Sequence, residues 1–182
     1  MRAIELVFAV GWVLFWVYWL AAAFTMKRGR IPWSHELRIR ALIIVVVLIL
    51  FRLGAFRGAS LNTDPWRAAF GLVLFVLGLG FAVWARVNIG HNWGTPMSQK
   101  AEPELVTSGP YRLTRHPIYS GILLGTIGTS VALSWFWLIA TALAGVYFIY
   151  AATVEERYLA GQFPETYPAY KRSTKMLVPY VF

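Results

Sequence analysis

Two polar clusters carry the side chains of this sequence that are able to do chemistry. The first polar cluster is Arg115, His116 and Tyr119 at the start of an apolar segment, and the second is Glu155 and Glu156 near the end of the last apolar segment. An arginine beside the free N–H groups of a helix start attracts a carboxylate or a phosphate. Glutamates accept hydrogen bonds, and histidine and glutamate can transfer protons. We therefore expect the function at these two clusters.

Composition places the two clusters in a membrane protein. Hydrophobic residues make up 58% of the sequence and charged residues only 14%, which is far more apolar than a soluble domain. The net charge of +9 does not indicate a nucleic-acid-binding protein, because the basic residues form no stripe interleaved with aromatic residues. The sequence has no cysteine, which excludes disulfides, thiolate catalysis and cysteine-ligated metals. We expect an all-α integral membrane protein without a metal site.

Five apolar segments are candidates for transmembrane helices, because about 20 residues cross roughly 30 Å of hydrocarbon. They cover residues 3–26, 37–56, 66–87, 118–133 and 135–158 of a single transmembrane domain, residues 1–182. The first is too long for the core of a signal peptide, and no small-residue cleavage site follows it. The last two are joined across Ser134 alone, which predicts a helical hairpin.

The basic residues predict the sidedness of these helices. Lysines and arginines concentrate between the first two segments, in the loop 88–117 and in the tail 159–182, and they are sparse in the other connections. Cytoplasmic segments carry the excess of lysine and arginine. We therefore expect the N-terminus outside, and the loop and the tail on the cytoplasmic side together with both polar clusters.

Small residues predict how the two clusters meet. Gly121, Gly125 and Gly128 follow one another at spacings of four and three, so a neighbouring helix backbone can approach closely. The segment 135–158 offers a comparable small face at Ala140, Ala144 and Gly145. We expect these two helices to pack through these faces, which brings the start of one, and its polar cluster, beside the end of the other.

The loop 88–117 is expected to form a wall of the site. A connection of this length is usually functional in a compact protein, and its prolines and glycines predict irregular structure rather than a helix. Pro117 then opens the next helix at a favoured first-turn position. Within the loop we expect Asn92 and Trp93 to touch a substrate, with packing of Trp93 in the interior as the alternative.

The motifs in the second half of the chain resemble one known family. They consist of the run Leu105–Gly109, Tyr111, the Arg-His-Pro that begins at Arg115, Tyr119, Gly121, the pair Glu155 and Glu156, Phe163, Tyr167, Tyr170 and Pro179. As a set, over residues 90–179, they resemble the isoprenylcysteine carboxyl methyltransferase family. The resemblance implies an integral membrane methyltransferase that takes a methyl group from S-adenosylmethionine without a Rossmann domain, and the sequence has no Gly-x-Gly-x-x-Gly loop.

The resemblance also implies a role for each candidate residue. The cofactor-binding residues are Leu105, Val106, Gly109, Tyr111, His116, Tyr119, Glu155 and Glu156, and the catalytic residues are Arg115, Glu155 and Glu156. Arg115 suits the carboxylate of the donor or of the acceptor, and a tyrosine ring stabilises a sulfonium cation above its face. Because adjacent helical residues point about 100° apart, we expect only one of Glu155 and Glu156 to face the pocket.

Each of these residues also has a purely structural interpretation. Arg115 can be a loop charge, His116 can cap the following helix, and the two glutamates can be a solvated helix end. Tyr111 and Tyr119 can anchor the protein at the membrane interface, where tyrosines collect. The sequence leaves these alternatives open.

The expected reaction is carboxyl O-methylation of an isoprenylcysteine-like acceptor that enters from the bilayer. A carboxylate is ionised at neutral pH and needs no base, whereas a phospholipid amine would make Glu155, Glu156 or His116 the base. Methylation of a phospholipid amine or of a small thiol is the nearest alternative, because related families carry similar motifs. A membrane reductase that uses NADPH and a non-catalytic scaffold are more distant ones. The expected partners are membrane lipids and a lipophilic or lipidated substrate, not nucleic acid.

Overall fold

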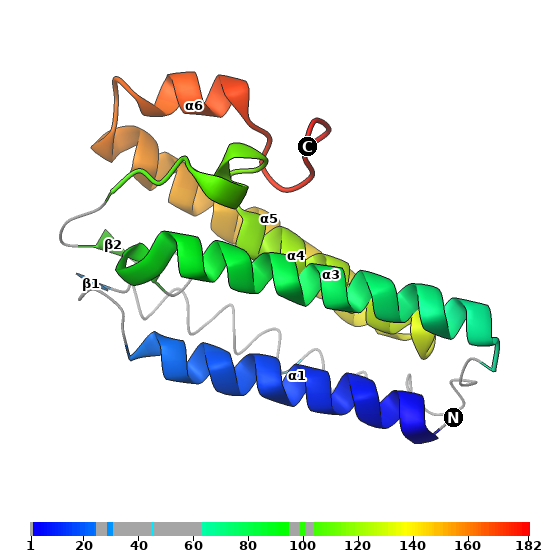
Figure 1. Ribbon diagram of the computed structural model, residues 1–182. Helices are drawn as coiled ribbons and strands as arrows, with labels where there is room; N and C mark the ends of the chain where they lie inside the picture. Colours follow the sequence, from blue (N-terminus) through cyan, green and yellow to red (C-terminus); the bar gives the residue numbers. More distant parts are fainter. Residues whose placement is uncertain (1, 25–28, 31–44, 46–62, 95–98, 101–103) are drawn as a thin grey trace.

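The protein is built from helices that run side by side. The computed structural model describes residues 2–24, 29–30, 45, 63–94, 99–100 and 104–182. The α-helices are α1 (Arg2–Ala23), α3 (Pro65–Ile89), α4 (Pro117–Ala132), α5 (Trp137–Gln162) and α6 (Tyr167–Ser173). Two 3-10 turns, η1 (Gly90–Asn92) and η2 (Gly109–Arg112), and the antiparallel strands β1 (Gly29–Arg30) and β2 (Gln99–Lys100) join them. Figure 1 shows α1, α3, α4 and α5 alongside one another, with α6 near the end of α5.

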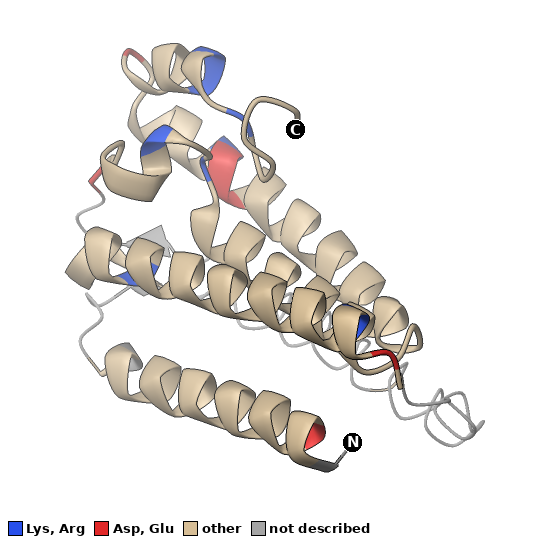
Figure 2. Ribbon diagram, turned by 45° about the vertical axis from the view of Figure 1, so that its right-hand side comes forward, with Lys and Arg blue, Asp and Glu red and all other residues tan. Residues whose placement is uncertain are grey.

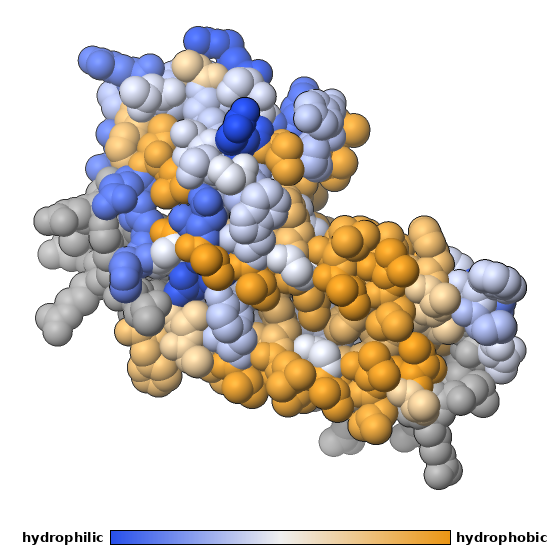
Figure 3. Space-filling model, viewed as in Figure 1, coloured by the Kyte–Doolittle hydropathy of each residue, from blue (hydrophilic) through white to orange (hydrophobic). Residues whose placement is uncertain are grey.

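The described helices match most of the predicted membrane segments. Three of them are long and apolar enough to span a membrane, at Ala3–Ala22, Pro65–Asn92 and Trp137–Gln162, and the shorter apolar helix is Pro117–Ala132. The predicted segment 37–56 lies almost wholly outside the described residues, so five spans remain a prediction. Charged residues stay near the ends of the helices in Figure 2, and hydrophobic residues cover α1 and α3 in Figure 3. This distribution suits helices surrounded by lipid.

Local sequence signals set the ends of α3 and α4. The Asp64 side chain accepts a hydrogen bond from the Trp66 N–H at 2.9 Å and caps α3. Pro65 and Pro117 occupy the first helical positions, where a missing N–H costs nothing. α3 ends at Gly90, whose φ of 56° is a left-handed conformation that favours glycine. The loop that leads to the candidate site therefore begins at Gly90, where the backbone conformation ends α3.

Among the described helices, the most extensive contact joins α3 and α4, and glycines on both helices make it possible. A Cβ atom on Gly71 would lie 2.5 Å from the Gly128 carbonyl oxygen, and one on Gly121 would lie 2.5 Å from the Gly78 carbonyl oxygen. Backbones approach this closely only where both helices lack side chains. The expectation that the glycines of α4 contact the fifth helix is therefore wrong. They face α3, because α3 carries glycines at a matching interval of about two turns.

The helix α5 packs against another part of α4. Ser130 Oγ lies 3.3 Å from Thr141 Oγ1, and a Cβ on Gly145 would lie 3.9 Å from the Leu123 side chain. These contacts are looser than those between α3 and α4. They nevertheless hold α5 antiparallel to α4, so that the end of α5 lies near the start of α4, where the two polar clusters are.

A buried arginine ties α1 to the end of α3. The Arg86 side chain donates to the Ala22 carbonyl at 2.6 Å and to the Gly90 carbonyl at 2.8 Å. Its guanidinium lies 4.7 Å from the centre of the Trp93 ring, and Trp93 meets Trp19 of α1 edge to face at 5.6 Å. A buried cation is tolerated when carbonyl oxygens and an aromatic face surround it. Arg86 thus fixes the start of the loop against α1.

The substitution Gly78→Ala is expected to destabilise the protein, because the new methyl group would meet backbone atoms of Gly121 and Gly125 that cannot rotate away. Overpacking of this kind costs about 1 to 3 kcal/mol, so the thermal unfolding midpoint in detergent should fall. The matched control is Gly80→Ala, since a Cβ at Gly80 meets nothing within 4 Å. Equal midpoints for the two variants would contradict this packing.

Candidate functional site

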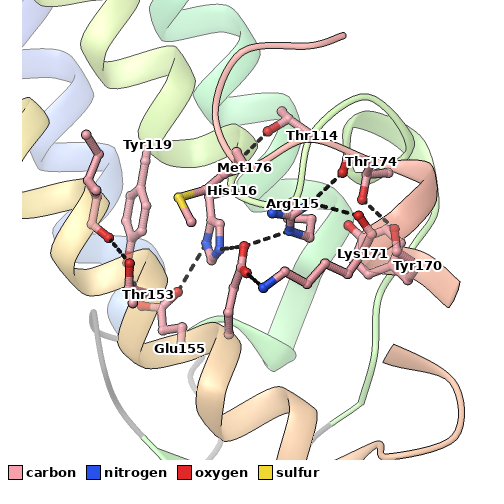
Figure 4. Close-up of polar contacts among 12 residues, drawn as sticks. Thr114, Arg115, His116, Tyr119, Thr153, Glu155, Tyr170, Lys171, Thr174 and Met176 are labelled. Atoms are coloured by element: carbon pink, nitrogen blue, oxygen red, sulfur yellow. Dashed lines mark hydrogen bonds and ion pairs between the residues drawn. The ribbon is translucent and has the colours of Figure 1, made fainter. Parts of the chain in front are cut away.

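The structure brings the two polar clusters together at one end of the helices, as Figure 4 shows. The Tyr119 hydroxyl donates to Glu155 Oε1 at 2.6 Å, and Arg115 Nε donates to Glu156 Oε1 at 2.6 Å. His116 lies between the carboxylates, with Nδ1 3.3 Å from Glu155 Oε2 and Nε2 3.6 Å from Glu156 Oε1. The predicted meeting of the start of α4 with the end of α5 is confirmed.

Glu155 and Glu156 differ in burial although both reach His116. The Glu156 side chain is only 4% exposed, and its second oxygen lies 2.8 Å from Lys171 Nζ. The Glu155 side chain is 24% exposed. Glu156 therefore has a cationic partner for each oxygen, whereas Glu155 is the carboxylate of the pair that a molecule from outside can approach.

The Arg115 guanidinium holds the segment that follows α6. Its Nη1 atom donates to the Thr174 carbonyl and, at 3.2 Å, to the Lys171 carbonyl. With Nε bound to Glu156, this one side chain joins α4, α5 and the C-terminal segment. From the sequence, Lys171 was predicted only to be one of the basic residues of the cytoplasmic tail, and no role was predicted for Thr174. No local pattern signals these contacts, because the partners lie far apart in the sequence.

Backbone hydrogen bonds continue this attachment. The Arg115 N–H donates to the Lys175 carbonyl at 2.8 Å, and the His116 N–H donates to the Met176 carbonyl at 3.1 Å. The Thr114 hydroxyl donates to the same Met176 carbonyl at 2.5 Å. Residues 174–177 therefore form part of the wall of the site, which the tail 159–182 was not expected to provide.

Three aromatic rings form a stack beside Glu155. The His116 and Tyr119 rings are nearly parallel, at 3° with centres 5.5 Å apart, and Tyr119 stacks on Phe148 of α5 at 8° and 4.5 Å. His116 and Tyr119 are both buried. The stack fixes the direction of the Tyr119 hydroxyl, and through it the position of the Glu155 carboxylate.

The two carboxylates favour the charged form of His116. Burial by itself lowers the pKa of the imidazole, but the interactions with Glu155 and Glu156 outweigh burial and raise this pKa above its usual value. The charged form that this shift favours donates from both ring nitrogens. Within the described residues, no group of three His, Asp or Glu side chains is arranged to hold a metal ion.

The loop residues form the opposite side of the site. Gly109 has a φ of 56°, and a Cβ there would collide with the Asn88 side chain, so this position requires glycine. Tyr111 is buried, and its carbonyl accepts a hydrogen bond from the Tyr170 hydroxyl at 2.7 Å. Burial, with a further contribution from the charge of Glu155, raises the pKa of the Tyr111 hydroxyl well above its usual value. Leu105 and Val106 are half-buried.

Asn92 and Trp93 lie at the other end of the loop, against α1 and α3. Trp93 is 8% exposed and packs on Arg86 and Trp19, as described above. Asn92 is 3% exposed, and its Nδ2 donates to the Glu104 carbonyl at 3.0 Å, while its Oδ1 accepts no hydrogen bond. The hydrogen bond from Nδ2 orients the Asn92 side chain, so that Oδ1 is a buried acceptor without a partner among the described residues.

Comparison with known proteins identifies the family. A family model described as phospholipid methyltransferase matches residues 66–166. The protein-S-isoprenylcysteine O-methyltransferase B of Arabidopsis thaliana is 32% identical over 146 residues, which cover 78% of this chain and 73% of the relative. This chain belongs to the isoprenylcysteine carboxyl methyltransferase family. The family predicted from the motifs between residues 90 and 179 is confirmed.

Two further relatives define the extent of the match. The cobalt-zinc-cadmium resistance protein CzcN of Cupriavidus metallidurans is 32% identical over 139 residues, 75% of this chain, and the chain spans only 61% of that protein's length. The solved structure of the eukaryotic intramembrane Ras methyltransferase ICMT aligns with a TM-score of 0.61 at 23% identity, over 78% of this chain and 52% of that one. The likeness shows that this family member has an integral membrane, helical fold.

The substitution Glu156→Gln is expected to loosen the C-terminal segment. It leaves the buried Arg115 guanidinium without its charged partner, and breaking a buried ion pair in this way costs about 3 to 5 kcal/mol. Hydrogen exchange in detergent should become faster at the Arg115 and His116 N–H groups, which bind residues 175 and 176. The control is Arg157→Gln at the neighbouring exposed position. Unchanged exchange in Glu156→Gln would contradict this role.

The charge of His116 is expected to make stability depend on pH. The folded state raises its pKa above the usual 6.5, so this contribution is fully present below about pH 6.5 and is lost as the pH rises through the raised pKa. The thermal unfolding midpoint of the wild-type protein in detergent should therefore decline above that pH. His116→Asn should show a flatter profile. Identical profiles would show that His116 carries no such charge.

Proposed function

We propose that this chain is a membrane methyltransferase that uses S-adenosylmethionine to methylate the carboxylate of an isoprenylcysteine-like acceptor. The observation that carries the proposal is the Glu155 carboxylate, which is partly exposed and is held by Tyr119 and His116. The families of the matching model and of the Arabidopsis relative support methyl transfer as the reaction class.

The described residues fit such a methyl donor. S-adenosylmethionine supplies a methyl group on a sulfonium cation, and it also carries an amino group, a carboxylate and an adenosine. Glu155 offers a carboxylate to a cationic amino group. The Asn92 Oδ1 atom is buried without a partner in the described part of the chain and can accept a hydrogen bond from a ligand. Leu105, Val106, Gly109 and Tyr111 belong to the loop between Asn92 and the start of α4.

The cluster divides into residues that bind and residues that position. We assign Glu155 to ligand binding, with Tyr119 and His116 fixing its carboxylate. Two of the Arg115 nitrogens, Nε and Nη1, are taken by Glu156 and by backbone carbonyls, so we assign Arg115 and Glu156 to positioning. From the sequence, Arg115 was expected to bind the carboxylate of the donor or of the acceptor. In this proposal it positions other residues of the site instead.

The state of His116 favours a carboxylate acceptor over an amine. An acceptor amine must lose a proton before it can attack a methyl group, so it needs a base. The two carboxylates raise the pKa of His116 and favour its charged form, Glu156 is bound to Arg115 and Lys171, and Glu155 is assigned to the donor. A carboxylate is already ionised at neutral pH and needs only position and a dry surrounding. The cluster is suited to these two tasks.

The proposal includes the sidedness that the basic residues predict. The end of the helices that carries the site would face the cytoplasm, where a soluble methyl donor is available. A lipophilic acceptor would then reach the same end from the bilayer, between the helices. The apolar surface of α1 and α3 in Figure 3 supports lipid contact along their length.

Binding of S-adenosylhomocysteine to the purified protein tests the donor. Calorimetry in detergent should give saturable binding, and NADPH should give none. Transfer of a radiolabelled methyl group to a farnesylcysteine analogue, to phosphatidylethanolamine or to a short thiol then identifies the acceptor class. Absence of S-adenosylhomocysteine binding would overturn the proposal, and transfer to the amine or the thiol alone would overturn the acceptor.

The substitution Glu155→Gln is expected to weaken S-adenosylhomocysteine binding, because a neutral amide replaces the carboxylate that would accept the amino group. A hydrogen bond to a charged group contributes about 1.5 to 3 kcal/mol, which is about a ten- to hundredfold rise in Kd. Arg157→Gln, on the exposed side of the same helix turn, should bind like the wild type. Equal Kd values for the two variants would remove Glu155 from the site.

A further inference from the structure

An exposed apolar turn follows the segment that pairs with the start of α4. We call residues 177–182 the C-terminal turn. Leu177 is buried at 5% exposure, whereas four of the five side chains after it are exposed, by 50% at Val178, 86% at Tyr180, 74% at Val181 and 50% at Phe182. Apolar side chains gathered in this way on one short segment indicate an interaction surface.

The backbone of the C-terminal turn is hydrogen-bonded within itself. The Leu177 and Val178 N–H groups donate to the Phe182 carbonyl at 2.7 and 2.6 Å. The Val181 and Phe182 N–H groups donate to the Val178 carbonyl at 3.1 and 3.0 Å. These four N–H groups are paired within the turn and do not need water, which lowers the cost of placing this part of the turn in contact with lipid.

The C-terminal turn is attached level with the beginning of an apolar helix. The Ser120 hydroxyl, in the first turn of α4, donates to the Leu177 carbonyl at 2.5 Å. Figures 1 and 2 both place the C-terminus beside the helices rather than beyond their ends. The exposed apolar side chains therefore stand where the apolar part of the bundle begins, which is the level of a membrane interface.

Basic residues precede the C-terminal turn, and acidic residues are absent from it. Arg172 and Lys175 are exposed. Residues 166–182 contain no aspartate or glutamate in the sequence. Basic side chains next to exposed apolar ones are typical of segments that lie in the interface and bind anionic lipids. The charge of this surface complements a leaflet that contains such lipids.

We propose that the C-terminal turn docks into the headgroup region of the surrounding leaflet, with Val178, Val181 and Phe182 entering the acyl boundary and Arg172 and Lys175 binding anionic headgroups. The proposal rests on the membrane location and not on the methyl-transfer reaction. Residues 175 and 176 bind the Arg115 and His116 backbone. Lipid contact at the turn therefore stabilises the segment that closes the candidate site.

Site-specific fluorescence tests the proposal, because the chain has no cysteine of its own. Val181→Cys carries a nitrobenzoxadiazole probe, and Glu165→Cys, at an exposed polar position between α5 and α6, is the matched control. The full chain is placed in nanodiscs of phosphatidylcholine and phosphatidylglycerol, with lipids that bear a doxyl quencher on the acyl chain. The probe at 181 should emit at shorter wavelength, lose emission to the doxyl lipids and resist aqueous iodide. The probe at 165 should behave in the opposite way.

Two results would overturn the docking. One is quenching by iodide at 181 equal to that at 165, which would place the turn in water. The other is protection from both quenchers, which would place it against protein. Phe182→Cys repeats the measurement in case a label at Val181 disturbs the turn.

A second arm tests the charge. More phosphatidylglycerol should increase the doxyl quenching at 181, and the double variant Arg172→Gln, Lys175→Gln should lose this increase. Quenching that does not respond to phosphatidylglycerol, or that responds equally in the double variant, would overturn the headgroup contacts.

Discussion

The buried ion pair between Arg115 and Glu156 is the interaction on which the site depends. Burying two charges costs more than their attraction returns unless each is also hydrogen-bonded. Here Glu156 has Arg115 at 2.6 Å and Lys171 at 2.8 Å, and Arg115 also donates to carbonyls at the end of α6. The pair therefore orders the start of α4, the end of α5 and the segment 174–177 in one step. Glu155 is positioned as the neighbour of this fixed point.

The site is positioned by the helix pair α3 and α4, whose close contact does not depend on the hydrophobic effect. Helices in lipid gain little from burying apolar surface against one another, so close backbone contact between small residues replaces the hydrophobic effect. Gly71 and Gly78 of α3 meet Gly121 and Gly128 of α4 in this way. Methyl transfer depends on aligning the reacting atoms, and a misplacement of about 1 Å is costly. The close contact between α3 and α4 therefore serves the proposed chemistry as well as stability.

Glu155 and Glu156 are neighbours of one chemical type, but their surroundings differ. Glu156 is enclosed by cations, whereas Glu155 is partly exposed and is bound by a neutral hydroxyl and by His116. The same two carboxylates raise the pKa of His116, which favours its charged form.

The sequence by itself determined the membrane class, the positions of α1, α3, α4 and α5, the family, and the membership of Arg115, His116, Tyr119, Glu155 and Glu156 in one cluster. These properties follow from apolar length and from motifs that are local in the chain. Only the tertiary structure decided that the glycines of α4 face α3, that Arg115 binds Glu156 and the C-terminal segment, and that Lys171 belongs to the cluster. A helix that is apolar on every side gives no periodic signal of its rotation. Its partners are therefore decided by packing, which joins residues far apart in the sequence.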